Sequence, residues 1–360
     1  MRKFLFAVLA FGIMLQVYPC TTFFLATPDG TMIFGRNFDF PTGQGHICIN
    51  EKGLKKMAFI QPPEKPLSWV SRYGSISFNQ AGREFPYGGM NEAGLVIEQM
   101  WLQETQYPDA DERYGLPELQ WIQYQLDMSA TVQELVDSDS LLRITNRSVA
   151  PLHFLVSDQN GDVAVVEYLD GEMKVRRGDD LPHPVLANCP YVRSLDFKIQ
   201  KDEGSTESFT NWTLNSSGRF AKAAKLLEQY QGNENPVDYA FAILDSVGQG
   251  PATQWSIVYD LSDQRIYYRT YANRQIKVLD MDDFDFSCDN HDIYADIDQY
   301  AESPGDFLPY SYETNLKLIR DVFSNVDFLR EHVPDEAKMA SAKYPESIVC
   351  LKDGTNQITE

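Results

Sequence analysis

The chain is poor in the residues and spacings that hold metal ions or build a serine nucleophile. Its five histidines are dispersed, and none of its cysteines are spaced as a zinc site requires. No Gly-x-Ser-x-Gly segment is present, so the sequence does not predict a serine-hydrolase nucleophile elbow. We therefore expect no metal site, and the mechanism expected below needs no cofactor. The odd cysteine count leaves at least one thiol unpaired, and spacing does not decide the pairing of Cys20, Cys48, Cys189, Cys288 and Cys350.

Positive charge is also scarce. The 31 Lys and Arg residues stand against 52 Asp and Glu residues, for a formal net charge of −21. So acidic a protein is disfavoured as a partner of nucleic acid or of an anionic membrane surface. Beyond the first 17 residues, no apolar run approaches the ~20 residues that a membrane-spanning helix needs. We expect no membrane-spanning segment after removal of the leader.

Residues 1–19 are typical of a secretory leader. Arg2 and Lys3 precede an apolar run over residues 4–17, which is a charged region followed by a short hydrophobic region. We expect export to the periplasm or to the cell exterior. Tyr18 and Pro19 are larger than the residues that a signal peptidase prefers, so the final trimming before Cys20 stays open between a peptidase and autocatalysis.

Removal of this leader would make Cys20 the first residue of the mature chain. A thiol in that position lies beside its own α-amino group, whose reference pKa of about 7.7–8.0 lets it accept the thiol proton. Arg36 and Asp39 follow on a predicted returning strand, where an arginine favours a thiolate and an aspartate can orient the amine. Two other interpretations stay open: Cys20 is the acylated residue of a lipoprotein, or a buried, inert or disulfide-bonded cysteine.

The pattern of apolar residues predicts an α+β fold in a single domain, with sheets between helix layers. Period-two runs bounded by turn residues predict strands at 21–26, 31–35, 68–79, 94–102, 152–157, 163–168, 173–176, 254–260 and 265–271. Helical spacing predicts helices at 119–128, 131–142, 219–230, 236–247 and 315–328.

Six short motifs, taken in order, resemble those of the choloylglycine hydrolase and penicillin V acylase family. They are Cys20–Phe23, Gly35–Asp39, Gly89–Leu95, Pro151–His153, Leu186–Pro190 and Ser217–Phe220. The resemblance implies a four-layer αββα fold, with antiparallel sheets between the helix layers, of the N-terminal-nucleophile amide hydrolases. It covers residues 20–281. Residues 282–360 form an acidic extension with one predicted helix, packed on or appended to the same domain, which we interpret as a solvated appendage or alternatively as a substrate or cation surface.

The resemblance also implies roles for individual residues. Cys20 is the nucleophile, Arg36 tunes its thiol, and Asp39 holds the free amino group. Asn188 stabilises the oxyanion, and Arg219, which we expect to open a helix, is the remaining arginine of the site.

The family's second oxyanion contributor falls on Trp101, which can donate through Nε1 or its backbone N–H. Each partner of Cys20 also has a structural interpretation. Arg36 can be an ion partner of Asp39, Asn188 a turn residue before proline, Arg219 an exposed residue at a helix start, and Trp101 part of the core.

We expect the Cys20 thiolate to attack a non-peptide amide, forming a thioester that water resolves. The resemblance offers three substrate classes: conjugated bile salts, penicillin V and N-acyl homoserine lactones. Loops set specificity on such folds, so the natural substrate stays open, as does a homo-oligomer. The alternative is a secreted or lipid-anchored binding protein with an inactive site.

Overall fold

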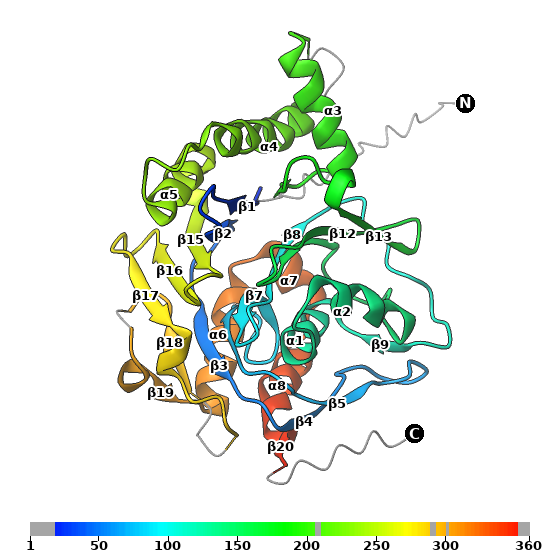
Figure 1. The fold of residues 1–360 in the computed structure, drawn as a ribbon. Helices are drawn as coiled ribbons and strands as arrows, with labels where there is room; N and C mark the ends of the chain where they lie inside the picture. Colours follow the sequence, from blue (N-terminus) through cyan, green and yellow to red (C-terminus); the bar gives the residue numbers. More distant parts are fainter. Residues whose placement is uncertain (1–18, 206–209, 289–292, 300–301, 352–360) are drawn as a thin grey trace, which may run out of the picture.

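The computed structural model describes residues 19–205, 210–288, 293–299 and 302–351 (Figure 1). Two antiparallel sheets form its centre, with strand orders β14-β1-β2-β15-β16-β17 and β13-β12-β11-β8-β7-β6-β3-β18-β19. The strands of the first sheet are β1 Thr21–Ala26, β2 Met32–Asp39, β14 Val185–Leu186, β15 Thr253–Asp260, β16 Arg265–Thr270 and β17 Lys277–Asp280. Those of the second are β3 His46–Asn50, β6 Ser75–Asn79, β7 Pro86–Asn91, β8 Val96–Trp101, β11 Leu152–Ser157, β12 Val163–Leu169, β13 Glu172–Arg177, β18 Ile293–Asp296 and β19 Leu308–Pro309.

Two small sheets and three groups of helices complete the fold. A parallel pair joins β9 Tyr114–Leu116 to β10 Leu142–Ile144, and an antiparallel set contains β4 Leu54–Met57, β5 Ser68–Val70 and β20 Val349–Cys350. The helices are α1 Glu118–Met128, α2 Val132–Asp137, α3 Tyr191–Asp202, α4 Asn211–Gln229, α5 Pro236–Val247, α6 Tyr312–Ser324, α7 Asp327–His332 and α8 Asp335–Lys343. None of the helices described here is both long enough and apolar enough to cross a bilayer.

The elements stack as helix, sheet, sheet, helix. Helices α4 and α5 pack on the first sheet through β1, β2 and β15, and α1 packs on β7 and β8 of the second (Figure 1). Alternate residues of β8 enter different cores, as strand geometry requires: Val96 and Met100 join the larger core with β1, β2 and β15, and Ile97 joins the smaller core with α1 and α2. The expected α+β fold with a four-layer αββα arrangement is confirmed.

Several predicted elements have different bounds in the structure. Residues 68–79 form two strands, β5 and β6, and the helix predicted at 131–142 ends at Asp137 and leads into β10. Helix α4 begins at Asn211, so Arg219 lies in its interior and the prediction that Arg219 opens a helix is wrong. Gly218 suggested the break, but a helix tolerates one glycine at a cost of about 1 kcal/mol.

The C-terminal extension is not a solvated appendage, and that interpretation is wrong for its described part. Leu318, Ile319 and Val322 of α6 are buried in the larger core. A Cβ atom on Gly82, in the β6–β7 loop, would lie 2.7 Å from Ile319 Cδ1, so α6 packs directly on that loop. The Asp-rich residues 280–306 suggested a solvated tail. The helix that follows them, α6, has a charged exposed side and a buried apolar side.

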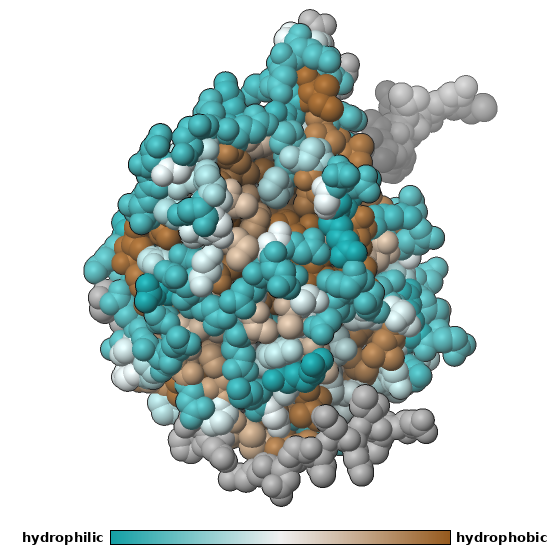
Figure 2. All heavy atoms as spheres, viewed as in Figure 1, coloured by the Kyte–Doolittle hydropathy of each residue, from teal (hydrophilic) through white to brown (hydrophobic). Residues whose placement is uncertain are grey.

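The surface is largely hydrophilic on the face drawn in Figure 2, with hydrophobic residues showing mainly in recesses. Helix α3 is an exception, since Val192 and Ile199 are exposed on it. Single exposed apolar residues are common on protein surfaces.

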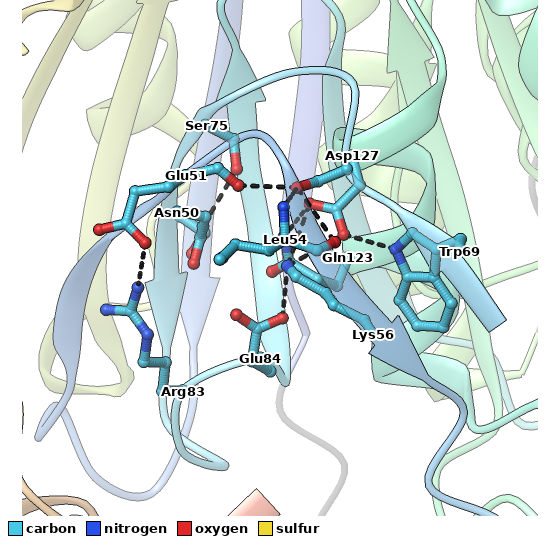
Figure 3. Close-up of polar contacts among 12 residues, drawn as sticks. Asn50, Glu51, Leu54, Lys56, Trp69, Ser75, Arg83, Glu84, Gln123 and Asp127 are labelled. Carbon is cyan, nitrogen blue, oxygen red and sulfur yellow. Dashed lines mark hydrogen bonds and ion pairs between the residues drawn. The ribbon is translucent and has the colours of Figure 1, made fainter. Parts of the chain in front are cut away.

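A buried ionic cluster ties the small β4–β5–β20 sheet to the second large sheet and to α1 (Figure 3). Lys56 Nζ on β4 lies 2.6 Å from Glu84 Oε2 and 3.0 Å from Asp127 Oδ2, and all three side chains are buried. Asp127, at the end of α1, also accepts hydrogen bonds from Trp69 Nε1 at 2.7 Å and Gln123 Nε2 at 2.8 Å. Removing one member of such a cluster leaves the others charged in a medium that solvates them poorly.

Lys56→Met should therefore lower the free energy of unfolding by about 3–5 kcal/mol. Lys52→Met is the matched control, because Lys52 pairs with Glu92 at 2.9 Å but is about half exposed, and such pairs contribute ~1 kcal/mol or less. Urea unfolding followed by circular dichroism measures both variants. Equal losses would show that the buried cluster has no special role.

Candidate active site

The β1–β2 hairpin places Cys20 beside Asp39. The strands pair antiparallel with Thr21 opposite Asn37, so the residue before β1 meets the end of β2. Cys20 is buried, and its thiol points to the Asp39 carbonyl oxygen at an Sγ to O distance of 3.8 Å. Gly35 is required in this hairpin, because a Cβ atom there would lie 2.4 Å from the Phe23 ring.

The Asp39 carboxyl group is buried, and one of its two oxygens accepts a hydrogen bond. The register of β2 and β15 sets Thr253 opposite Asp39, and the Thr253 hydroxyl donates a hydrogen bond to Asp39 Oδ1. Oδ2 is buried and has no hydrogen-bond partner among the described residues. Burial raises the pKa of Asp39 to about 6, against the opposing effects of the Thr253 hydrogen bond and of the positive charges of Arg219 and Arg36.

Arg219 enters the site from α4 and is buried, not exposed. Its Nη1 donates to the Cys20 carbonyl oxygen and to Thr21 Oγ1, and its Nη2 donates to Asn188 Oδ1 at 3.2 Å. Burial lowers the pKa of Arg219 to about 10, so the guanidinium is charged at neutral pH. One side chain thus binds the nucleophile's backbone and the candidate oxyanion residue.

Asn188 follows β14, whose pairing with β1 brings it next to Cys20. Its backbone N–H donates to Ser216 Oγ and its Nδ2 to the Trp101 carbonyl oxygen, both at 2.8 Å. An amide nitrogen carries two hydrogens, so the bond to Trp101 leaves a second one. The Trp101 indole N–H points to Gln103 Oε1 at 3.3 Å, and its ring packs on Phe328.

Arg36 pairs with Glu98 of β8 and not with Asp39, so the interpretation as an Arg36–Asp39 ion pair is wrong. Its Nη1 donates to Glu98 Oε2 and, at 3.1 Å, to the Tyr87 carbonyl oxygen. Arg36 and Glu98 are fully buried, and Arg36 Nε and Nη2 have no hydrogen-bond partner in the part of the chain that the structure describes. Glu98 was not among the predicted site residues, although an acidic residue between two core-facing positions of a strand, Val96 and Met100, was a signal.

His153 and Glu167 support the segment that carries Asn188. His153 Nε2 lies 2.7 Å from the Ala187 carbonyl oxygen, and its Nδ1 lies 3.2 Å from Glu167 Oε1. The same carboxylate oxygen accepts a hydrogen bond from the Tyr191 backbone N–H at 2.9 Å. Both ends of the turn around Asn188 are therefore held by side chains of the second sheet.

Burial disfavours the thiolate form of Cys20 in this chain. Burial raises the pKa of Cys20, while the positive charges of Arg36 and Arg219 act in the opposite direction. Pro19 precedes Cys20 here, so the Cys20 nitrogen is an amide and cannot act as a base. A reactive thiolate would need a proton acceptor, and the Cys20 nitrogen is not one while Pro19 is attached.

A cavity of about 840 Å³ reaches Cys20, Asp39 and Trp101. Arg36, Asn188 and Arg219 are not among its lining residues. Its volume is in the range of pockets that enclose a small molecule, and its lining is mainly apolar and aromatic. Across the described ranges, no group of three or more His, Cys, Asp or Glu side chains is placed to hold a metal ion.

The family model for linear amide C-N hydrolases of the choloylglycine hydrolase family matches residues 20–203, half of the chain, beginning at Cys20. The chain belongs to the choloylglycine hydrolase family. Members of this family are hydrolases of linear amide C–N bonds.

Two curated relatives illustrate the range of that family. A penicillin V acylase of Pectobacterium atrosepticum is 31% identical over 186 residues, which are 47% of this chain and 48% of that protein. A bile salt hydrolase/transferase of Lactiplantibacillus plantarum is 26% identical over 302 residues, covering 69% of this chain and 88% of the other. The chain thus spans about half the length of the penicillin V acylase and most of the bile salt enzyme.

Solved structures share the fold. Penicillin V acylase from Agrobacterium tumefaciens has a TM-score of 0.69 at 25% identity, covering 81% of this chain and 98% of that one. A variant of conjugated bile acid hydrolase from Clostridium perfringens has a TM-score of 0.63 at 20% identity, covering 79% and 98%.

Asp39 should make the chain that retains Pro19 less stable as the pH rises. Because the folded-state pKa of about 6 lies above the usual value of 3.8 for an aspartate, the folded state binds the proton more tightly, and stability falls between about pH 4 and pH 6. The wild-type free energy of unfolding, relative to Asp39→Asn, should drop by about 2 kcal/mol over that range. Denaturant unfolding at several pH values measures the difference, with the exposed Asp29→Asn as control. Parallel pH profiles for wild type and Asp39→Asn would contradict the assignment.

Arg36→Met should slow the alkylation of Cys20 by iodoacetamide at a given pH. The positive charge of Arg36 lowers the pKa of the thiol, so its removal raises that pKa and reduces the thiolate fraction. Mass spectrometry of Cys20 over a pH series follows the shift. Arg83→Met, which removes another buried arginine, is the control, and an equal shift there would refute a specific effect of Arg36.

Proposed function

We propose that this protein hydrolyses non-peptide linear amides with Cys20 as an N-terminal nucleophile. The observation that carries the proposal is the convergence on Cys20: its thiol contacts the Asp39 carbonyl, its own carbonyl is held by Arg219, and it lies at a large apolar cavity. Cys20 is also the first residue that the family model matches. The proposal includes export, with residues 1–19 removed by a peptidase, by autocatalysis or by both.

Removal of the leader changes the chemistry of the site. The Cys20 nitrogen becomes an amine, and this amine takes the proton of its own thiol. Asp39 Oδ2, the buried acceptor without a partner among the described residues, receives a hydrogen bond from the resulting ammonium group. Arg36 and Arg219 stabilise the thiolate through their positive charges.

The thiolate then attacks the amide carbonyl carbon, and the carbonyl oxygen becomes an oxyanion. The second hydrogen of Asn188 Nδ2 and the backbone N–H near Trp101 donate to it. Arg219 fixes the orientation of Asn188 through its bond to Oδ1. A single such donor is worth about 10²–10³ in rate in other enzymes.

Collapse of the intermediate breaks the C–N bond. The ammonium group of Cys20 gives its proton to the leaving nitrogen, so the amine departs neutral and the acyl group stays on Cys20 as a thioester. The α-amine, again neutral, removes a proton from water, whose oxygen attacks the thioester. The products are a carboxylic acid and the free Cys20 thiol.

The substrate is an N-acyl amide with an apolar acyl group, as the lining of the cavity favours. Penicillin V, conjugated bile salts and N-acyl homoserine lactones are the three candidates. A similarity to a penicillin V acylase and to bile salt hydrolase/transferases supports the first two. The competing proposal, an inactive exported or lipid-anchored binding protein, keeps the cavity but lacks a free Cys20 amine.

Cys20→Ala should abolish amine release from all three substrates, because no other group replaces the nucleophile, while the circular dichroism spectrum stays unchanged. Cys48→Ala, which removes a buried thiol of β3, should retain activity. Amine release is scored by fluorogenic labelling, and the N-terminal residue of each preparation is determined by mass spectrometry. Hydrolysis that persists in Cys20→Ala would refute the nucleophile. A mature chain with a diacylglyceryl group on Cys20 would favour the binding protein.

A further inference from the structure

The C-terminal extension supplies one wall of the cavity that holds Cys20. The wall segment, defined here as residues 323–341, runs from the end of α6 through α7 and into α8. Its apolar lining residues are Phe323, Val326, Phe328, Leu329 and Val333. The family model ends at residue 203, so this wall lies outside the region that it matches.

We propose that the wall segment limits the length of the acyl group that this protein accepts, with Leu329 and Phe328 as specificity-determining residues. This inference rests on the proposed function and extends it to the acyl side of the substrate. The ligand class is an uncharged, apolar acyl chain bonded to a carboxyl or amide group.

The chemistry of the wall favours such a chain. Phe323, Val326 and Leu329 are buried, so their side chains face the interior. Phe59, Phe85 and Leu119 line other parts of the same cavity. The polar lining residues of α7, among them Glu331 and His332, are exposed. A carbon chain between these groups would bury its methylenes, and each buried methylene strengthens binding by about fourfold.

The wall also contacts the catalytic end of the cavity. The rings of Phe328 and Trp101 pack edge to face, with their centroids 5.3 Å apart. The carbonyl oxygen of Trp101 accepts the hydrogen bond from Asn188 Nδ2. Phe328 is therefore part of the wall segment and also contacts Trp101, whose carbonyl oxygen positions the candidate oxyanion donor Asn188.

Several ties hold the extension in place, so that the wall has a defined position. A disulfide joins Cys288 to Cys350, and β20 pairs with β4. Tyr344, just after α8, donates its hydroxyl hydrogen to the Met57 carbonyl oxygen at 2.8 Å. Asn315 of α6 accepts a hydrogen bond from the Arg83 backbone N–H at 2.9 Å. These contacts attach the extension to β4 and to the β6–β7 loop. Phe59, after β4, and Phe85, in that loop, line other sides of the cavity.

Binding of fatty acids, the products of acyl amide cleavage, tests the wall without requiring turnover. Titration calorimetry on the full chain carrying Cys20→Ala, with saturated acids from butanoate to tetradecanoate, gives affinity as a function of chain length. Adding Leu329→Trp should lower the affinity for tetradecanoate at least about tenfold, while butanoate changes less than about twofold. Ile199→Trp, on the exposed face of α3, is the matched control and should change neither.

A second variant, which removes a side chain from the wall, tests the proposal even if the indole added at Leu329 prevents folding. Phe328→Ala enlarges the cavity and should move the tightest binding to longer acids. Equal effects of Leu329→Trp on short and long acids, or no effect of either variant on length dependence, would overturn the proposal.

The same variants with Cys20 intact separate this inference from the proposed function. Suppose that the protein releases no amine from any acyl amide, but that its binding depends on chain length and Leu329→Trp abolishes that dependence. This result would support the role of the wall segment and refute only the proposed hydrolase activity. Hydrolysis with unchanged length preference in Leu329→Trp would refute only the wall.

Discussion

The buried guanidinium of Arg219 is the interaction on which the geometry of the site depends. It binds the carbonyl oxygen of Cys20, the hydroxyl of Thr21 and the side-chain oxygen of Asn188. These acceptors come from β1 and from the turn after β14, while the arginine comes from α4. A buried cation is costly unless its hydrogen bonds are satisfied. Because the guanidinium of Arg219 needs these acceptors, helix α4 has to lie against the ends of β1 and β14 at this position.

Charge compensation extends from this point into the second sheet. Arg36 lies on β2 but finds its carboxylate partner, Glu98, on β8 of the facing sheet. Gly88 makes room for that carboxylate, because a Cβ atom there would lie 2.1 Å from Glu98 Oε2. The two sheets are therefore joined by a buried ion pair next to the thiol, in addition to their apolar contacts. Replacing such a pair by apolar groups is often neutral, but removing one partner leaves the other charge buried and unpaired, which is strongly destabilising.

The C-terminal extension connects the periphery of the fold to the site. Its helix α6 packs on the β6–β7 loop through Ile319 and Gly82, and its helix α7 reaches the cavity through Phe328. The extension belongs to the larger core even though it follows all the strands of the first sheet. The walls of the cavity therefore come from segments that lie far apart in the sequence.

Much of the architecture was predictable from local pattern. Alternating strands, turn residues and amphipathic helices predicted the layers, and ordered motifs predicted which residues gather at Cys20. Some predicted helix bounds and the predicted burial of one helix were wrong, because local sequence signals pointed in different directions. Gly218 suggested the start of a helix that in fact begins at Asn211. The Asp-rich residues 280–306 suggested a solvated tail, although α6, which follows them, has a buried side.

The sequence by itself determined the fold class, the family and the group of candidate residues, because periodicity and motif order are local properties of the chain. Only the tertiary structure decided that Arg36 pairs with Glu98, that Asp39 keeps one buried oxygen without a partner in the described chain, and that α7 borders the cavity. The physical reason is that partner choice, burial and the pKa shifts that burial causes depend on which distant segments pack together, and no local pattern records that packing.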